Sequence, residues 1–154
     1  MTTLSADETF AAGKCFAALL GKGSIVALKG PLGAGKTRFV KGIAGGLGIE
    51  EEVTSATYTI ISEYEAFPAA GSPVLFYHID AYRLKGSDDF SAIGGEDIIF
   101  GGGISVIEWG ERIEELLPPE ALRVDIEISD GDKRFIRIYR KGGSLPAGRM
   151  GAGA

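Results

Sequence analysis

The sequence predicts a single α/β domain with a mixed, mainly parallel sheet, flanking helices and a C-terminal antiparallel hairpin. Two observations carry this prediction. The apolar run 24–29 leads directly into a glycine-rich turn and a helical segment at 36–47, which is the strand, loop and helix order of a parallel sheet. Near the C-terminus, alternating segments at 122–129 and 133–140 flank an Asp-Gly-Asp turn at 130–132, a pattern typical of a hairpin. The length of 154 residues fits one domain.

The first element expected is an N-terminal helix. Ser5 and Glu8 have the spacing of a capping box, in which each side chain satisfies a free amide at the helix start. Apolar residues then recur at helical spacing as far as Gly21, a residue type that ends helices. This helix therefore precedes the strand at 24–29.

Further strands are expected in the middle of the chain. The segment 58–64 is rich in β-branched and aromatic residues, which favour a strand. Apolar runs at 74–79 and 104–107 each end in an acid, Asp80 and Glu108 respectively. Short helices are predicted at 87–93 and 110–117.

The domain is predicted to span 1–140, followed by a Gly- and Ala-rich tail at 141–154. The large apolar residues of the tail are Leu145 and Met150. Their burial would stabilise the tail by about 3 to 6 kcal/mol. Ordering the segment costs about 1 to 2 kcal/mol per residue, so the tail is expected to be disordered.

Composition limits the classes of function and partner. Lys and Arg total 16 against 21 Asp and Glu, a net charge of −5, so the chain is not expected to grip nucleic acid by itself. Any RNA would be held by a partner protein. The single cysteine, Cys15, is expected to be a small core residue, and its isolation favours a reducing compartment. Without a membrane-length apolar run, a cytoplasmic location and no membrane partner are expected.

The segment 30–37 reads GPLGAGKT, a complete GxxxxGK[ST] phosphate-binding loop between the first sheet strand and its helix. Glycines permit the backbone conformations that turn successive amides inward, and the helix dipole favours an anion at the same point. By the mechanics of this motif, Lys36 reaches the β and γ phosphates and the Thr37 hydroxyl ligates Mg²⁺. We therefore predict a P-loop NTPase domain that binds a nucleoside triphosphate and Mg²⁺. The nucleotide-binding residues expected here are Gly30, Gly33, Ala34, Gly35, Lys36, Thr37 and Arg38.

Asp80 and Glu108 are candidates for the second part of the site. Both follow apolar strands, and α/β sheets bind their ligands at the carboxyl ends of the strands. Glu108 is expected to hold Mg²⁺ with Thr37, and Asp80 to position water, with Lys36 completing the catalytic set. The opposite assignment of the two acids remains open. Purely structural roles are also open: Glu108 could stabilise the first turn of the helix that follows it, and Asp80 could serve to form a turn.

Four segments together resemble the TsaE family, also called YjeE, bacterial ATPases of tRNA threonylcarbamoyladenosine biosynthesis. They read GPLGAGKTRFVKGIAGGLG, TSATYTIISEYE, FYHIDAYRL and ISVIEWGERIEELLP, and lie between 30 and 119. The P-loop is shared by many NTPases, whereas HxDxYR at 78–83 and IEW at 107–109 are specific to this family.

The resemblance implies a single domain that binds ATP and Mg²⁺ and joins the transferase subunits TsaB and TsaD. ATP hydrolysis would then reset that complex between rounds of modification. The family's functional residues fall on Thr37, Asp80 and Glu108. The family's Ser-Pro-Thr switch-like segment reads Ser-Ala-Thr here, ending in Thr57, which is expected to contact the nucleotide. Loss of the proline is expected to loosen that segment.

Three neighbouring residues have two interpretations each. His78, the single histidine, is either packed in a strand or functional as part of HxDxYR. Trp109 either stacks near the nucleotide or packs at the helix start, and packing is favoured. Arg83 either donates to phosphate or forms a surface ion pair.

Rival functions use the same loop. A small-molecule kinase needs further cations around the transferred phosphoryl group, and between Arg38 and Arg112 the sequence offers Arg83 alone. A GTPase would carry [NT]KxD and DxxG, and neither pattern occurs in the sequence. A third possibility is a nucleotide-gated scaffold that hydrolyses ATP poorly without its partners. ATP hydrolysis in a tRNA-modifying complex is the preferred prediction.

Overall fold

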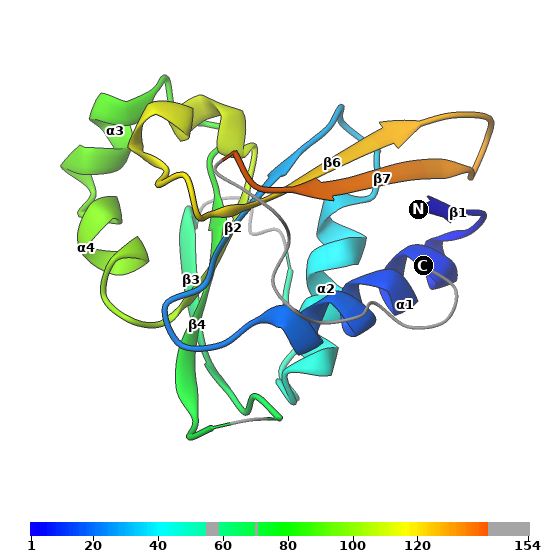
Figure 1. Cartoon of the computed structure of the whole chain (residues 1–154). Helices are drawn as coiled ribbons and strands as arrows, with labels where there is room; N and C mark the ends of the chain where they lie inside the picture. The colour runs from blue at the N-terminus through cyan, green and yellow to red at the C-terminus, as the bar shows by residue number, and fades with distance from the viewer. Residues whose placement is uncertain (55–58, 70, 142–154) are drawn as a thin grey trace.

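A seven-stranded sheet forms the centre of the protein in a computed structural model that describes residues 1–54, 59–69 and 71–141 (Figure 1). The strands are β1 (Thr2–Thr3), β2 (Ile25–Lys29), β3 (Ile61–Ala66), β4 (Val74–Asp80), β5 (Ile104–Glu108), β6 (Leu122–Ile128) and β7 (Arg134–Tyr139). The helices are α1 (Ala6–Phe16), α2 (Lys36–Gly46), α3 (Ser87–Ala92) and α4 (Gly95–Ile99), with 3₁₀ turns η1 (Ala17–Leu19) and η2 (Gly110–Leu116).

The strand order is β1-β7-β6-β2-β5-β4-β3. The four central strands, β6, β2, β5 and β4, pair in parallel. The sheet continues with antiparallel β7 and β1 on one side and antiparallel β3 on the other. The predicted mixed sheet and its C-terminal hairpin are therefore confirmed.

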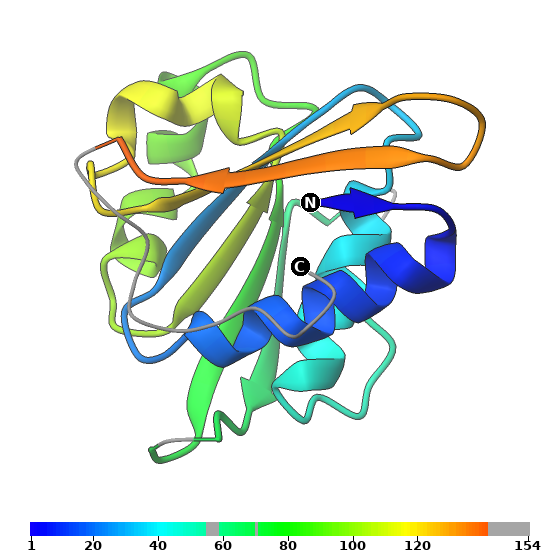
Figure 2. The ribbon, with the colours of Figure 1, turned by 45° about the vertical axis from the view of Figure 1, so that its right-hand side comes forward.

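Helices cover both faces of the sheet. Figures 1 and 2 show α1 and α2 on one face, and α3 and α4 on the other. Alternate side chains of β2 serve the two layers: Val26 and Leu28 join the core under α1 and α2, whereas Ile25 and Ala27 join the core under the other helices. Burial on both faces explains why this strand is continuously apolar.

Helices α1 and α2 approach closely because glycine occupies their crossing point. A Cβ atom on Gly13 would lie 2.2 Å from the Phe39 carbonyl oxygen, and one on Gly42 would lie 2.1 Å from the Phe10 carbonyl oxygen. The rings of Phe16 and Phe39 pack beside this crossing with centroids 5.5 Å apart. The crossing fixes α2, and with it the loop that precedes α2.

Strand β3 differs from its predicted limits. It runs to Ala66, two residues beyond the predicted end, because it pairs with β4 from Ile61 opposite Ile79 to Ala66 opposite Val74. Part of the predicted start falls at 58, outside the described residues. Pairing with a distant segment, which local propensity does not encode, sets these limits.

Helix α4 was not predicted, because its five residues lie between glycines and are too few to show a helical period. The helix expected at 110–117 is a 3₁₀ segment interrupted at Ile113.

Cys15 is exposed, so its expected place in the core was wrong. It lies on α1, where Phe16 takes the buried position. The predicted tail falls almost wholly at 142–154, outside the described residues. Within the described part of the chain, no helix has the length and apolar character needed to cross a bilayer.

Candidate active site

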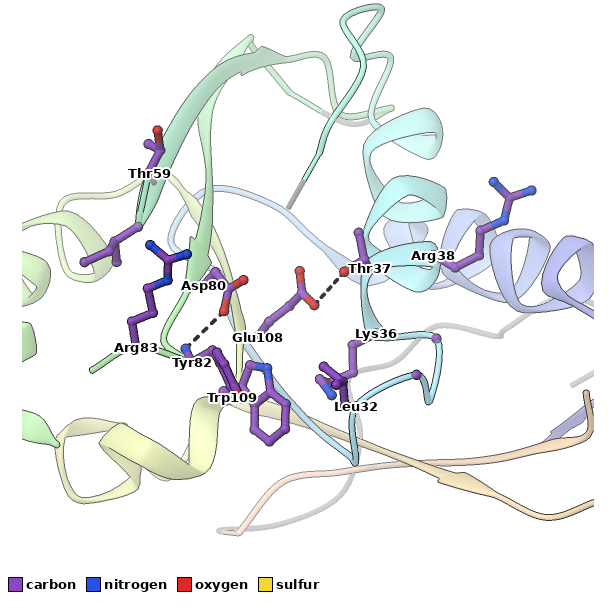
Figure 3. Close-up of a pocket in the computed structure, with 13 residues that line it drawn as sticks. Leu32, Lys36, Thr37, Arg38, Thr59, Asp80, Tyr82, Arg83, Glu108 and Trp109 are labelled. Atoms are coloured by element: carbon purple, nitrogen blue, oxygen red, sulfur yellow. Dashed lines mark hydrogen bonds between the residues drawn. The ribbon is translucent and has the colours of Figure 1, made fainter. Parts of the chain in front are cut away.

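A pocket of about 430 Å³ opens where β2, β5 and β4 end, beside the start of α2 (Figure 3). Loop, helix and strand ends all contribute to it. Its lining residues are Leu32, Gly33, Gly35, Lys36, Thr37, Arg38, Thr59, Ile60, Asp80, Tyr82, Arg83, Glu108 and Trp109. The pocket therefore brings together the predicted phosphate-binding loop and both predicted acids.

The loop between β2 and α2 depends on glycine at three points. Gly33 and Gly35 have φ values of 79° and 100°, in the region that side chains disfavour. A Cβ atom on Gly30 would lie 2.4 Å from the Ile126 carbonyl oxygen, so the loop starts in close contact with β6. Gly35 is the N-cap of α2, which places the amino end of that helix at the pocket.

Lys36 is 5 % exposed and lies within the loop. Its Nζ donates to the carbonyl oxygens of Gly30 and Pro31, the latter across 2.9 Å. The ammonium also lies 4.0 Å from the centroid of the Trp109 ring, a cation–π contact. Burial lowers the pKa of Lys36 from its ordinary value, although the negative charges of Glu108, Glu111 and Asp80 oppose this shift.

Glu108 joins the loop to the sheet through both carboxyl oxygens. The Thr37 hydroxyl donates to Oε1 across 2.8 Å, as Figure 3 shows. Nε2 of His78 lies 2.6 Å from Oε2. Glu108 and His78 are each only 3 % exposed. Because a buried carboxylate needs donors, these two contacts hold Glu108 in a fixed orientation beside Thr37.

Asp80 lies opposite Glu108 in the parallel pairing of β4 with β5. Figure 3 shows both carboxyl groups in the pocket. Asp80 Oδ1 also accepts a hydrogen bond from the Tyr82 amide across 3.0 Å, as a turn-forming Asp does. The structural and functional interpretations of Asp80 are thus compatible, since the turn orients a carboxylate that faces the pocket.

The donor set suits a magnesium ion that is shared with phosphates. Thr37, Asp80 and Glu108 offer hard oxygen ligands at one place, and Mg²⁺ in phosphate-transfer sites takes one or two protein ligands together with phosphate oxygens and water. Among the described residues, no group of three or more His, Cys, Asp or Glu side chains is placed to hold a metal without such help.

Some predicted residues lie away from the pocket centre. The Arg38 guanidinium pairs with Asp7 across 3.0 Å, and Figure 3 shows this side chain directed away from Glu108. Ala34 is buried and Gly30 packs on β6, so both support the loop from behind the pocket lining. Thr57 lies outside the described residues. A role for these residues in nucleotide binding stays a prediction.

The position of Trp109 is compatible with both of its interpretations, packing at the helix start and stacking near the nucleotide. Its half-buried ring packs against the core between the sheet and α3, and also lies below Lys36 in the pocket. Its φ of 60° is uncommon outside glycine, and this backbone turn directly follows Glu108. The Tyr82 ring lies 5.0 Å from that of Trp109. No role was predicted for Tyr82, although it is the tyrosine of the HxDxYR motif at 78–83 and the sequence therefore carried a signal for it.

Leu32, Thr59 and Ile60 also line the pocket without having been predicted. Leu32 is a variable position of the loop motif, and Thr59 and Ile60 precede β3 with no chemical signature of their own. Arg83 lines the same pocket, a location that is compatible with both of its interpretations, so its role stays a prediction.

Curated proteins from other organisms are similar in sequence to this chain over most of its length. A protein of Treponema pallidum (strain Nichols), named tRNA threonylcarbamoyladenosine biosynthesis protein TsaE, is 42% identical over 132 residues, covering 85% of this chain and 93% of the relative. A protein of the same name from Bacillus subtilis (strain 168) is 40% identical over 140 residues, covering 91% of this chain and 84% of the relative.

A solved structure is also similar. The crystal structure of Bacillus subtilis YdiB matches with a TM-score of 0.70 and 37% sequence identity, covering 92% of this chain and 84% of that one. The family model described as "Threonylcarbamoyl adenosine biosynthesis protein TsaE" matches residues 3–136. The chain therefore belongs to the TsaE family, whose curated members carry names that place them in the biosynthesis of threonylcarbamoyladenosine in tRNA.

Proposed function

We propose that this protein binds ATP with Mg²⁺, hydrolyses it, and serves as an accessory subunit for the threonylcarbamoyladenosine modification of tRNA. In this proposal it acts with TsaB- and TsaD-type transferase subunits and resets their complex between turnovers. The observation that carries the proposal is the hydrogen bond from Thr37 at the end of the phosphate-binding loop to Glu108 at the end of β5. It joins the two parts of a P-loop NTPase site, the phosphate-binding loop and the acid at a strand end, within one pocket.

The loop and the strand-end acids have different proposed roles. The amides of the loop and the ammonium of Lys36 bind the phosphates, for which the amino end of α2 provides a favourable dipole. Thr37 and Glu108 would hold Mg²⁺, which neutralises charge that develops on the phosphate oxygens. Asp80, one strand away from Glu108, orients the attacking water. His78 keeps the buried Glu108 carboxylate aligned.

Charge supports a partner-dependent role. The net charge of −5 disfavours direct binding of the chain to tRNA. The tRNA would therefore be held by the transferase subunits, and hydrolysis by the isolated chain would be slow. A nucleotide-gated scaffold differs from an autonomous enzyme in this respect, because its turnover rises when its partners bind.

The test measures ATP hydrolysis by the chain alone, then with TsaB- and TsaD-type subunits and unmodified tRNA, while threonylcarbamoyladenosine is scored over several turnovers. We expect the partners to stimulate hydrolysis and repeated modification to require ATP. Lys36→Ala should abolish both signals, and Glu115→Gln, a change at an exposed carboxylate of η2, should preserve them. If ATP binds but the partners alter neither signal, the accessory role is wrong and phosphoryl acceptors should be screened for a small-molecule kinase.

A further inference from the structure

The turn between β6 and β7 contacts the outer side of the phosphate-binding loop through Arg134, the first residue of β7. Arg134 Nε donates to the Ala34 carbonyl oxygen across 3.0 Å, and Nη2 donates to the Gly33 carbonyl oxygen across 3.3 Å. These residues are 100 and 101 positions apart in the sequence. The guanidinium also donates through Nη1 to the carbonyl oxygens of Gly131 and Lys133 in the hairpin turn. One side chain thus links the hairpin turn to the loop.

The contact has a direct consequence for the inner side of the loop. In a trans peptide unit, the carbonyl oxygen and the following amide hydrogen point in opposite directions. A donor that holds the Ala34 carbonyl on the outside therefore directs the Gly35 amide inward. Gly35 lines the pocket and caps α2, so its amide lies among the groups that bind phosphate in such a loop.

Arginine suits this task better than lysine would. Its guanidinium is a planar fork of donors, which can engage several carbonyl oxygens at fixed angles, whereas an ammonium is a point charge on a flexible stem. The hairpin turn also has backbone hydrogen bonds of its own, besides those that Arg134 makes within it. The Ser129 amide donates to the Lys133 carbonyl oxygen across 2.9 Å, and the Lys133 amide donates to the Asp130 carbonyl oxygen across 2.8 Å.

The hairpin also supports the start of the loop. Gly30 packs so closely on β6 that a Cβ atom would lie 2.4 Å from the Ile126 carbonyl oxygen. Strand β6 thus contacts the loop at Gly30, and Arg134 of β7 donates to the carbonyl oxygens of Gly33 and Ala34. The C-terminal hairpin, which contributes no residue to the pocket lining given above, fixes the loop at both places.

We propose that Arg134 is a positioning residue of the nucleotide site, which preorganises the loop, and its Gly35 amide in particular, by holding the carbonyl oxygens of Gly33 and Ala34 from outside. The effect on affinity rests on the proposed binding of ATP by this loop. A flexible loop must lose conformational freedom when phosphate binds, and a loop that is already held loses less.

The competing explanation is a long-range attraction between a cation and the negative phosphates. Lysine at position 134 would preserve that attraction, and high salt would suppress it. We call the hydrogen bonding of Arg134 to the Gly33 and Ala34 carbonyls the clamp. If the clamp is responsible, lysine should not fully restore nucleotide affinity, because an ammonium does not reproduce the paired donors. High salt should change the effect little, because salt screens short hydrogen bonds only weakly.

The experiment compares Arg134→Ala, Arg134→Lys and Arg137→Ala with the parent chain. Arg137 is the matched control: it lies on the other face of β7, its side chain is 68% exposed, and it pairs with Asp125. Calorimetry gives the Kd of Mg·ATP and Mg·ADP at about 0.05 M and about 0.5 M salt. Urea unfolding, and exchange of the Gly35 amide hydrogen followed by NMR, are recorded for each protein.

We expect Arg134→Ala to weaken Mg·ATP binding about tenfold at both salt concentrations and to speed exchange of the Gly35 amide. Arg134→Lys should restore less than half of the lost affinity, measured as the change in the logarithm of the Kd of Mg·ATP. The Kd of Arg137→Ala should lie within about twofold of the parent value. Full recovery by lysine, disappearance of the effect in high salt, or unchanged binding by Arg134→Ala overturns the inference. If Arg134→Ala does not fold, Arg134→Lys and its Gly35 exchange rate decide the question.

The two proposals fail in different ways. If the parent chain binds no ATP, the proposed function is wrong, yet faster Gly35 exchange in Arg134→Lys still supports the clamp. If the parent binds ATP and neither Arg134 variant changes affinity or exchange, the clamp is wrong and nucleotide binding stands.

Discussion

Thr37 and Glu108 are hydrogen-bonded across 2.8 Å although 71 positions separate them in the sequence. The hydroxyl belongs to the first turn of α2 and the carboxylate to the end of β5. Because β2 and β5 are paired in parallel, with Leu28 opposite Glu108, the loop that follows β2 starts beside this carboxylate. The sheet register therefore determines which acid faces the phosphate-binding loop.

Replacing Glu108 by glutamine should reduce ATP hydrolysis far more than ATP binding. The variant keeps the shape of the side chain and removes the charge proposed to organise Mg²⁺. A loss of about 100- to 1,000-fold in kcat is expected, the usual cost of one positioned transition-state contact. Rates should be measured in the assembled complex, with Glu115→Gln as the control at an exposed carboxylate. Near-normal turnover by Glu108→Gln would exclude this residue from the chemistry.

Asp80→Asn separates the chemical role of Asp80 from its role in the turn. Asparagine retains an oxygen that can accept the Tyr82 amide, so the variant loses the charge and keeps the turn. We expect a fall of about 100-fold or more in kcat, with an Mg²⁺ dependence close to that of the parent. Titration with Mg²⁺ should instead require more metal for Glu108→Gln. The converse pattern would assign the metal to Asp80 and the water to Glu108.

His78 should stabilise the fold by satisfying the buried Glu108 carboxylate. His78→Leu removes the partner that lies 2.6 Å from Oε2, so we expect a loss of about 1 to 3 kcal/mol in the free energy of unfolding. His78→Gln can place a donor near the position of Nε2 and should retain most of the stability. Urea denaturation compares the two variants. Equal stability of His78→Leu and the parent would show that the contact contributes nothing.

Gly42 and Gly45 provide a matched pair of glycines on α2. Alanine at Gly42 would place Cβ 2.1 Å from the Phe10 carbonyl oxygen, so α1 and α2 must separate, at a cost of about 1 to 3 kcal/mol. Alanine at exposed Gly45 meets the end of the Phe10 ring at 3.4 Å, and its better helix propensity is worth up to about 1 kcal/mol. Thermal or urea unfolding should therefore show opposite signs for the two variants. A neutral Gly42→Ala would contradict the tight helix crossing.

Glu114 should make stability sensitive to acid. Burial raises its pKa, but hydrogen bonds and positive charge from Lys141 and Arg123 outweigh this effect and hold the pKa below its ordinary value of 4.5. The native state therefore binds fewer protons than the unfolded state, and the stabilisation present above that value is lost as pH falls through the lowered pKa. Arg123 is 4 % exposed and pairs with Glu114 across 2.9 Å, while its Nη1 donates to the carbonyl oxygens of Pro118, Pro119 and Ala121.

Glu114→Gln should accordingly lose about 1 to 2 kcal/mol of stability near neutral pH, a figure reduced for the partial exposure of the pair. The difference between variant and parent should narrow on acidification below the ordinary carboxyl pKa. Urea midpoints measured across the acid range provide the test. A difference that stays constant with pH would show that packing, and not charge, is responsible.

Local sequence signals predicted the central α/β unit and most of the residues that line the candidate pocket. The glycines of the loop, the apolar character of β2 and the acids that end β4 and β5 all act within a few residues, where backbone sterics and side-chain chemistry are visible in the sequence. The hairpin was predicted for the same reason. Strand limits and short helices were less accessible, as β3 and α4 show, because pairing and packing with distant segments define them.

The sequence by itself determined that Lys36 and Thr37 lie in a phosphate-binding loop and that Asp80 and Glu108 end strands at the same edge. Tertiary structure decided which side chains meet: Glu108 lies between Thr37 and His78, Arg38 turns away to Asp7, and Arg134 reaches the back of the loop. The physical reason is that a loop conformation follows from adjacent dihedral angles. A contact across 30 to 100 positions depends instead on sheet register and helix crossing, which the whole fold fixes together.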